Sequence, residues 1–97
     1  LIHNFKRDQK VGLAAFTLAR LHLEQLGNPG EAAVLFEYAI SSNLPAAMVE
    51  TAMARRVQAF RRIGDARRLA AGNEYLQKYP EGRYRDRVQE WMTPSAP

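Results

Sequence analysis

Apolar residues between positions 16 and 40 recur mostly three or four positions apart, in two runs separated by one break. The apolar positions of the two runs are Phe16, Leu18, Ala19, Leu21, Leu23 and Leu26, then Ala32, Ala33, Leu35, Phe36, Ala39 and Ile40. Such spacings place side chains on one side of an α-helix. The pattern predicts helices over about 9–26, capped by Asp8, and 29–42.

The break between these runs reads Gly27-Asn28-Pro29-Gly30. Glycine readily takes the left-handed conformation that ends a helix, asparagine caps a following helix, and proline is tolerated in a first helical turn. We therefore expect an antiparallel helical hairpin that ends before Pro45.

The second half repeats this order. A helix over about 46–63 places Val49, Met53, Val57 and Phe60 on one stripe, and Gly64-Asp65 repeats the break 37 positions after Gly27. A fourth helix, from 65 or 66 to about 78, takes Asp65 as its cap. It offers for packing Leu69, Gly72, Tyr75, Leu76 and Tyr79. A last helix is expected over 84–92, with Tyr84, Val88, Trp91 and Met92 on one side.

The first hairpin resembles a tetratricopeptide repeat, a helical pair of about 34 residues with the pattern W-x2-L-G-x2-Y, then A-x3-F, then P. The matching positions are Leu18-Ala19, His22, Ala32, Phe36, Ala39 and Pro45, whereas Ala15 replaces the tryptophan. The resemblance implies an all-α, right-handed α-solenoid fragment over 1–92, with two repeats and a C-terminal capping helix. Residues 93–97 are expected to form a disordered tail.

The second unit diverges, with Arg68 and Gly72 where the pattern has alanine and phenylalanine. Residues 75–83, YLQKYPEGR, nevertheless resemble a sub-type of the repeat seen in bacterial envelope proteins and in the tails of FecR-like regulators and anti-sigma factors. This resemblance implies a periplasmic or envelope location, and a cytoplasmic one stays open.

The chain has 97 residues, 46% of them hydrophobic, and no cysteine, which suits one small helical domain without disulfides or thiolate metal sites. No apolar run approaches the roughly 20 residues of a membrane span, so we expect no direct membrane insertion. Because residue 1 is leucine, we expect a fragment of a longer protein, with Leu1, Ile2 and Phe5 ending a preceding helix.

The net charge of +4 lies entirely in the second half, where residues 46–97 hold ten basic and six acidic side chains. A solvated arginine face is one interpretation, and an acidic partner is the other. The paired arginines at 55–56, 61–62 and 67–68 also suggest the hypothesis of nucleic-acid binding. That reading is disfavoured because the pairs straddle a turn and no aromatic stacking platform accompanies them.

Candidate chemistry is sparse. His22 has no His, Asp or Glu three or four residues away to form a metal-ligand pair, and it stands at the position of a packing tyrosine. Asn28-Pro29-Gly30 lacks the lysine of a phosphate-binding loop, and no nucleophile motif is present. We expect neither enzymatic activity nor a cofactor or metal.

The expected function is a non-enzymatic scaffold that binds a protein or peptide segment, an acidic one in particular, in a groove between the first helices of each pair. The resemblance assigns to this groove Phe16, Arg20, Glu24, Ala54, Gln58, Arg61 and Arg62. Arg61 and Arg62 would favour a partner bearing carboxylates. The alternative is a structural spacer or oligomerisation domain of a membrane-anchored regulator, which would expose an apolar self-association patch.

Overall fold

The computed structural model describes residues 9–94, which form five α-helices and no strand. These are α1 (Gln9–Glu24), α2 (Pro29–Ser41), α3 (Ala46–Arg62), α4 (Arg67–Lys78) and α5 (Arg85–Met92). The expected all-α class is confirmed for this part of the chain. The expectations for Leu1, Ile2, Phe5, the Asp8 cap and the last three residues of the tail lie outside the described residues.

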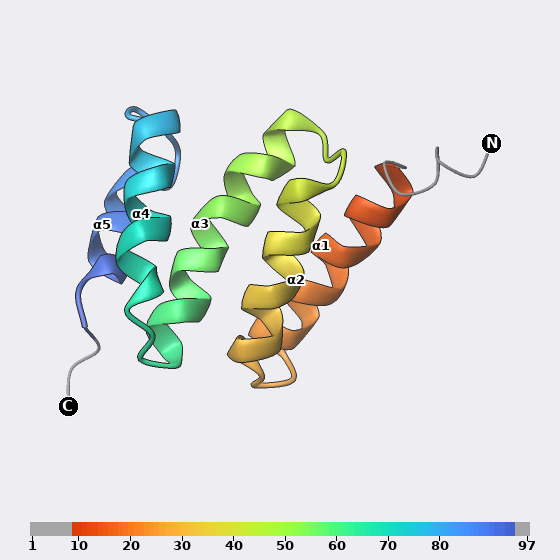
Figure 1. Cartoon of the computed structure of the whole chain (residues 1–97), viewed down its shortest axis with the longest axis horizontal. Helices are drawn as coiled ribbons and strands as arrows, with labels where there is room; N and C mark the ends of the chain where they lie inside the picture. The colour runs from red at the N-terminus through yellow and green to blue at the C-terminus, as the bar shows by residue number, and fades with distance from the viewer. Residues whose placement is uncertain (1–8, 95–97) are drawn as a thin grey trace.

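The helices pack in chain order, as Figure 1 shows, with α1 at one end of the row and α5 at the other. Helix α2 contacts both α1 and α3, and α4 contacts both α3 and α5. Helix α5 also packs on α3. Each of the two hairpins therefore buries a face against the other, and α5 covers the free side of the second.

The two glycine turns have the expected backbone conformation. Gly27 has φ 61° and Gly64 has φ 67°, both left-handed. The carboxylate of Asp65 accepts a 2.8 Å hydrogen bond from the N–H of Arg67, the first residue of α4, as a capping side chain does, although Ala66 occupies the N-cap position itself. Asn28 stands at the N-cap position of α2, as predicted, but its side chain makes no capping hydrogen bond.

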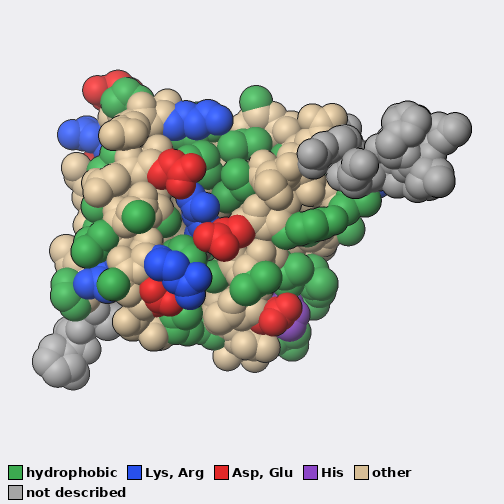
Figure 2. Space-filling view, viewed as in Figure 1, with side chains coloured by type: hydrophobic (Ala, Val, Ile, Leu, Met, Phe, Trp, Pro, Cys, Tyr) green, Lys and Arg blue, Asp and Glu red, His purple; other side chains and the backbone are tan. Residues whose placement is uncertain are grey.

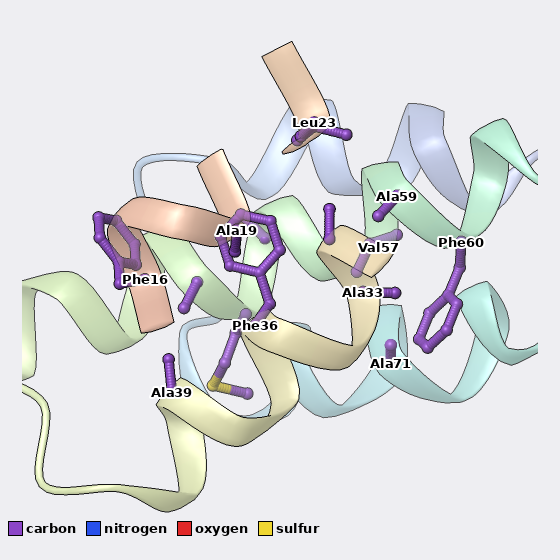
Figure 3. Close-up of a cluster of buried hydrophobic side chains, with 14 of the residues drawn as sticks. Phe16, Ala19, Leu23, Ala33, Phe36, Ala39, Val57, Ala59, Phe60 and Ala71 are labelled. Carbon is purple, nitrogen blue, oxygen red and sulfur yellow. The ribbon is translucent and has the colours of Figure 1, made fainter. Parts of the chain in front are cut away.

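The core of the first hairpin explains its pattern of small and large residues. Ala32, Ala39 and Phe36 have no exposed surface, and the ring of Phe36 meets that of Phe16 edge-on, with 6.1 Å between centroids. Figure 3 shows this cluster continuing through Val57 to α3 and α4. The small residues allow the helix backbones to approach while Phe36 fills the remaining space.

Four leucines that the pattern placed on packed faces are instead exposed. They are Leu18, Leu21, Leu26 and Leu69, exposed by 43%, 38%, 57% and 45%. Leu26 lies beyond α1, which ends two residues earlier than expected because the N–H groups of Gln25 and Leu26 both bond to the Leu21 carbonyl. The periodicity identified the helices correctly but gave some of them too broad a buried face.

Gly72 marks the contact between the last two helices. A Cβ atom at this position would overlap the side chain of Met92. On the same helix as Met92, Val88 and Trp91 are buried. A glycine thus stands where the repeat pattern has phenylalanine because α5 packs directly onto the α4 backbone.

Candidate functional site: a groove between α1 and α3

A groove of about 350 Å³ lies between α1 and α3 and is also lined by the turn that leads into α5. Helix α2 packs on both α1 and α3, while direct backbone contact between those two helices is sparse. The groove is lined by Phe16, Arg20 and Glu24 of α1, Ala47, Met48, Thr51 and Arg55 of α3, and Arg83 and Tyr84 of the turn.

The groove carries an excess of positive charge. Three guanidinium groups, those of Arg20, Arg55 and Arg83, face one carboxylate, that of Glu24. Arg20 and Glu24 form an i,i+4 ion pair at 3.6 Å on the exposed rim, which is a weak interaction in water. The guanidinium groups of Arg55 and Arg83 have no carboxylate partner among the groove residues, although the Glu50 carboxylate lies close to the backbone of Arg83.

Tyr84 is the aromatic centre of this site. The guanidinium carbon of Arg55 lies 5.8 Å from the centroid of its ring, and that of Arg83 lies 5.3 Å from it. The Tyr84 hydroxyl shares a 3.1 Å hydrogen bond with the Thr51 hydroxyl. Arg55 also donates to Gln58 Oε1 at 2.9 Å and lies 5.7 Å from the Trp91 ring centroid. These contacts favour positions of both guanidinium groups close to the Tyr84 ring.

The turn bearing Arg83 and Tyr84 is fixed to α3 through Glu50. Glu50 Oε2 accepts hydrogen bonds from the Tyr75 hydroxyl at 2.7 Å and from the Arg83 N–H at 2.8 Å. The Tyr75 oxygen in turn accepts a bond from the Tyr84 N–H at 2.9 Å. Any Cβ at Gly82 would overlap both the Tyr75 hydroxyl and the Glu50 carboxylate.

Burial, and then the hydrogen bond to Glu50, raise the pKa of Tyr75 to about 12. Burial also raises the pKa of Tyr79, with the charge of Glu50 as the second cause. Both phenols therefore stay protonated and neutral throughout the physiological range.

Of the seven residues predicted to line the groove, the three on α1 do so. Arg20 and Glu24 are exposed on its rim, and Phe16, only 6% exposed, contributes to its floor. None of the four α3 residues is among the lining residues.

Ala54 is fully buried, so the prediction that it contacts a partner is wrong. On α3 the groove is lined by Ala47, Met48, Thr51 and Arg55, whereas Ala54 belongs to the buried core. Gln58 lies one turn beyond Arg55 and supports its guanidinium.

Arg61 and Arg62 bond instead to backbone carbonyls near helix ends. Arg62 donates to the Leu23 carbonyl at 2.8 Å, and Arg61 donates to the Thr93 carbonyl at 3.2 Å. Arg68 likewise donates a hydrogen bond to the Met92 carbonyl at 2.9 Å. The last carbonyls of a helix lack intrahelical partners, so these arginines satisfy the ends of α1 and α5 from a neighbouring helix.

The interpretation of the arginines as a solvated face is wrong for Arg56, which is 8% exposed. It lies between α2 and α4, with Glu74 at 2.7 Å and Glu37 at 3.6 Å. Figure 2 shows acidic and basic side chains interleaved on this face of the molecule. By contrast Arg67 is exposed, and its bonds to Asp65 lower the pKa of that carboxyl group.

The residues described here hold no group of three or more His, Asp or Glu side chains that could bind a metal ion. His22 is half-buried, and its Nδ1 atom is enclosed without a hydrogen-bond partner. Within the same part of the chain, no helix is long and apolar enough to cross a membrane.

Sequence reasoning missed Ala47, Met48, Thr51, Arg55, Arg83 and Tyr84. Met48, Thr51 and Arg55 follow one another at spacings of three and four residues along one side of α3, a signal available in the sequence, but nothing local indicated that Arg83 and Tyr84 approach them. Compared with family models, curated proteins and solved structures, the chain matches none.

Proposed function

We propose that this chain is a tetratricopeptide-like scaffold that binds an acidic peptide segment in the groove between α1 and α3. The observation that carries the proposal is the lining of that groove, in which three arginines and one glutamate surround the apolar surfaces of Met48, Tyr84 and Phe16. Charged groups on an apolar floor suit a peptide with carboxylates and a hydrophobic anchor.

The repeated hairpins support the tetratricopeptide part of the proposal. Two helical pairs are each closed by a left-handed glycine, Gly27 and Gly64, and followed by a further helix that packs on the second pair. In the first pair, the alanines and the phenylalanine of the repeat pattern have no exposed surface. A stack of such hairpins exposes one side of its first helices as an extended binding surface.

The arrangement of the arginines supports an acidic ligand. Arg55 is held by its hydrogen bond to Gln58 and by the Tyr84 ring, so little of its side-chain entropy is lost when it binds an anion, and Arg83 lies near the same ring. A peptide carboxylate near this ring would receive charge-assisted hydrogen bonds, which are stronger than neutral ones. Arg20 and Glu24, on the opposite rim, would select the charge of a neighbouring ligand residue.

The test is a fluorescence-anisotropy titration of the chain with short labelled peptides of graded net charge. We expect acidic peptides to bind and basic ones not to. Arg20→Glu should weaken binding of the acidic peptide at least about tenfold, because it replaces attraction by repulsion at the rim. Glu24→Lys should strengthen it.

The matched control is Arg87→Glu, which makes the same charge change on an exposed arginine of α5 outside the groove. If Arg87→Glu weakens binding as much as Arg20→Glu does, the attraction comes from overall charge and the groove is not the site. A parallel titration with duplex DNA at two salt concentrations tests nucleic acid as the ligand, since phosphate binding falls steeply with salt.

A further inference from the structure

The two ends of the helical row have opposite surface character. At one end, the exposed residues of α5 are polar or charged: Arg85, Asp86, Arg87, Gln89 and Glu90. At the other end (Figure 1), the side of α1 that faces away from α2 carries an apolar surface. A helical stack needs a polar outer face where it ends in water, so α5 closes its end and α1 does not.

The apolar surface, called here the α1 outer face, comprises Leu13, Ala14, Thr17, Leu18 and Leu21. Leu18 and Leu21 are exposed by 43% and 38%, and no charged side chain interrupts the five. The opposite side of the same helix holds the buried residues Ala15, Phe16, Ala19 and Leu23. Helix α1 is thus apolar on two sides, which is the property of a helix covered from both.

We infer that a second copy of this chain covers the α1 outer face, with the two α1 helices packed antiparallel about a two-fold axis near Thr17. Leu13 and Leu21 lie four residues on either side of Thr17 and exchange places under that operation. Residues equidistant from position 17 meet across the axis, so Leu13 of one copy contacts Leu21 of the other, twice. Leu18 lies next to the axis and meets its own counterpart.

The charges that flank the face support the same pairing. Lys10 lies three residues before Leu13, and Glu24 lies three residues after Leu21, so each flanks one end of the face. The antiparallel arrangement places Lys10 of each copy beside Glu24 of the other, where Glu24 keeps its ion pair with Arg20. A parallel arrangement would instead place like charges together. Opposite charges at both ends of an apolar stripe thus select the antiparallel order.

Sedimentation velocity of the full chain over a concentration series tests this inference without any peptide ligand. We expect a reversible dimer. Leu18→Glu should raise its dissociation constant at least about a hundredfold, because two carboxylates then meet beside the axis. The control is Leu69→Glu, the same change at a similarly exposed leucine of α4, which should leave the dimer intact.

A cross-linking experiment tests the register. The chain has no cysteine, so Thr17→Cys places a single thiol near the proposed axis, and mild oxidation should give a covalent dimer. Leu69→Cys should give none above the level of random collision. Lys10→Glu should weaken the dimer, and adding Glu24→Lys should restore it.

Two results would overturn the inference: a wild-type chain that sediments as a monomer at every concentration, or a Leu18→Glu variant that dimerises like wild type. The first would leave the α1 outer face to another helix of a longer chain. Neither result bears on the groove, which is tested by its own titration.

Discussion

The hydroxyl of Tyr75 donates a 2.7 Å hydrogen bond to the carboxylate of Glu50, which lies 25 residues earlier in the chain. Tyr75 has no exposed surface, and the same carboxylate oxygen holds the N–H of Arg83. One buried phenol on α4 thus joins α3 to the turn that carries Arg83 and Tyr84 into the groove. The position of two groove residues therefore depends on a contact made outside it.

This contact predicts a loss of stability at high pH. In the folded chain the Tyr75 pKa is about 12, whereas its ordinary value is 10.0. Between these values the unfolded chain releases the proton and the folded chain retains it, so the free energy of unfolding falls as pH rises. The contribution is fully present below pH 10 and is lost towards pH 12. The free energy of unfolding should fall by about 2 kcal/mol across this range.

Urea denaturation at a series of pH values below and across that window measures the effect. Tyr75→Phe should be less stable than wild type at neutral pH and should show a shallower decline across the window. The remaining decline reports Tyr79, whose pKa is raised in the same direction, and the other groups that titrate there. Equal declines in wild type and variant would show that Tyr75 is not held protonated by the fold.

The second prediction concerns the core. Phe36→Ala should lower the free energy of unfolding by about 3 to 5 kcal/mol, because the ring is fully buried and its loss leaves a cavity against Phe16. Val34→Ala, on the same helix but 60% exposed, should change stability by less than about 0.5 kcal/mol. Chemical denaturation followed by circular dichroism measures both. A loss below about 1 kcal/mol for Phe36→Ala would mean that the packing around this ring is different.

The elements of this fold follow closely from local sequence, and the reasons are local. The left-handed turns at Gly27 and Gly64 and the Asp65 cap depend on residues within one turn of each other. The exposure of Leu18 and Leu69 could not be predicted, since periodicity marks an apolar side chain without saying whether anything covers it.

The candidate site was predicted only on its α1 side, because the other side depends on contacts between distant segments. Tyr84 approaches Thr51 across 33 residues, and Arg62 reaches the Leu23 carbonyl across 39. The sequence gives the number and the charge of the arginines. It does not show which of them lie close enough to a carbonyl at the end of another helix to bond to it. The α3 arginine that faces the groove, Arg55, could be told from the predicted Arg61 and Arg62 only once the helices were placed.

The last prediction concerns Arg56, whose buried guanidinium contacts Glu37 and Glu74 from two other helices. Removing a charge from the interior also removes the cost of desolvating it, so replacing a buried ion by an apolar side chain of similar length is often nearly neutral. Removing its partners leaves the charge buried and uncompensated, which is costly. Arg56→Met should therefore change the free energy of unfolding by less than about 1 kcal/mol, since the methionine keeps much of the packing of the arginine stem.

The double variant Glu37→Gln with Glu74→Gln should lose more, about 2 kcal/mol, although both carboxylates are themselves partly exposed and water offsets some of the loss. Adding Arg56→Met to that double variant should recover most of the stability, because no buried charge is then left without a partner. Urea denaturation of the four proteins closes the cycle. If Arg56→Met alone were the least stable of them, the ion pairs would contribute more than their desolvation costs, and the arginine would be a net stabilising link between α2, α3 and α4.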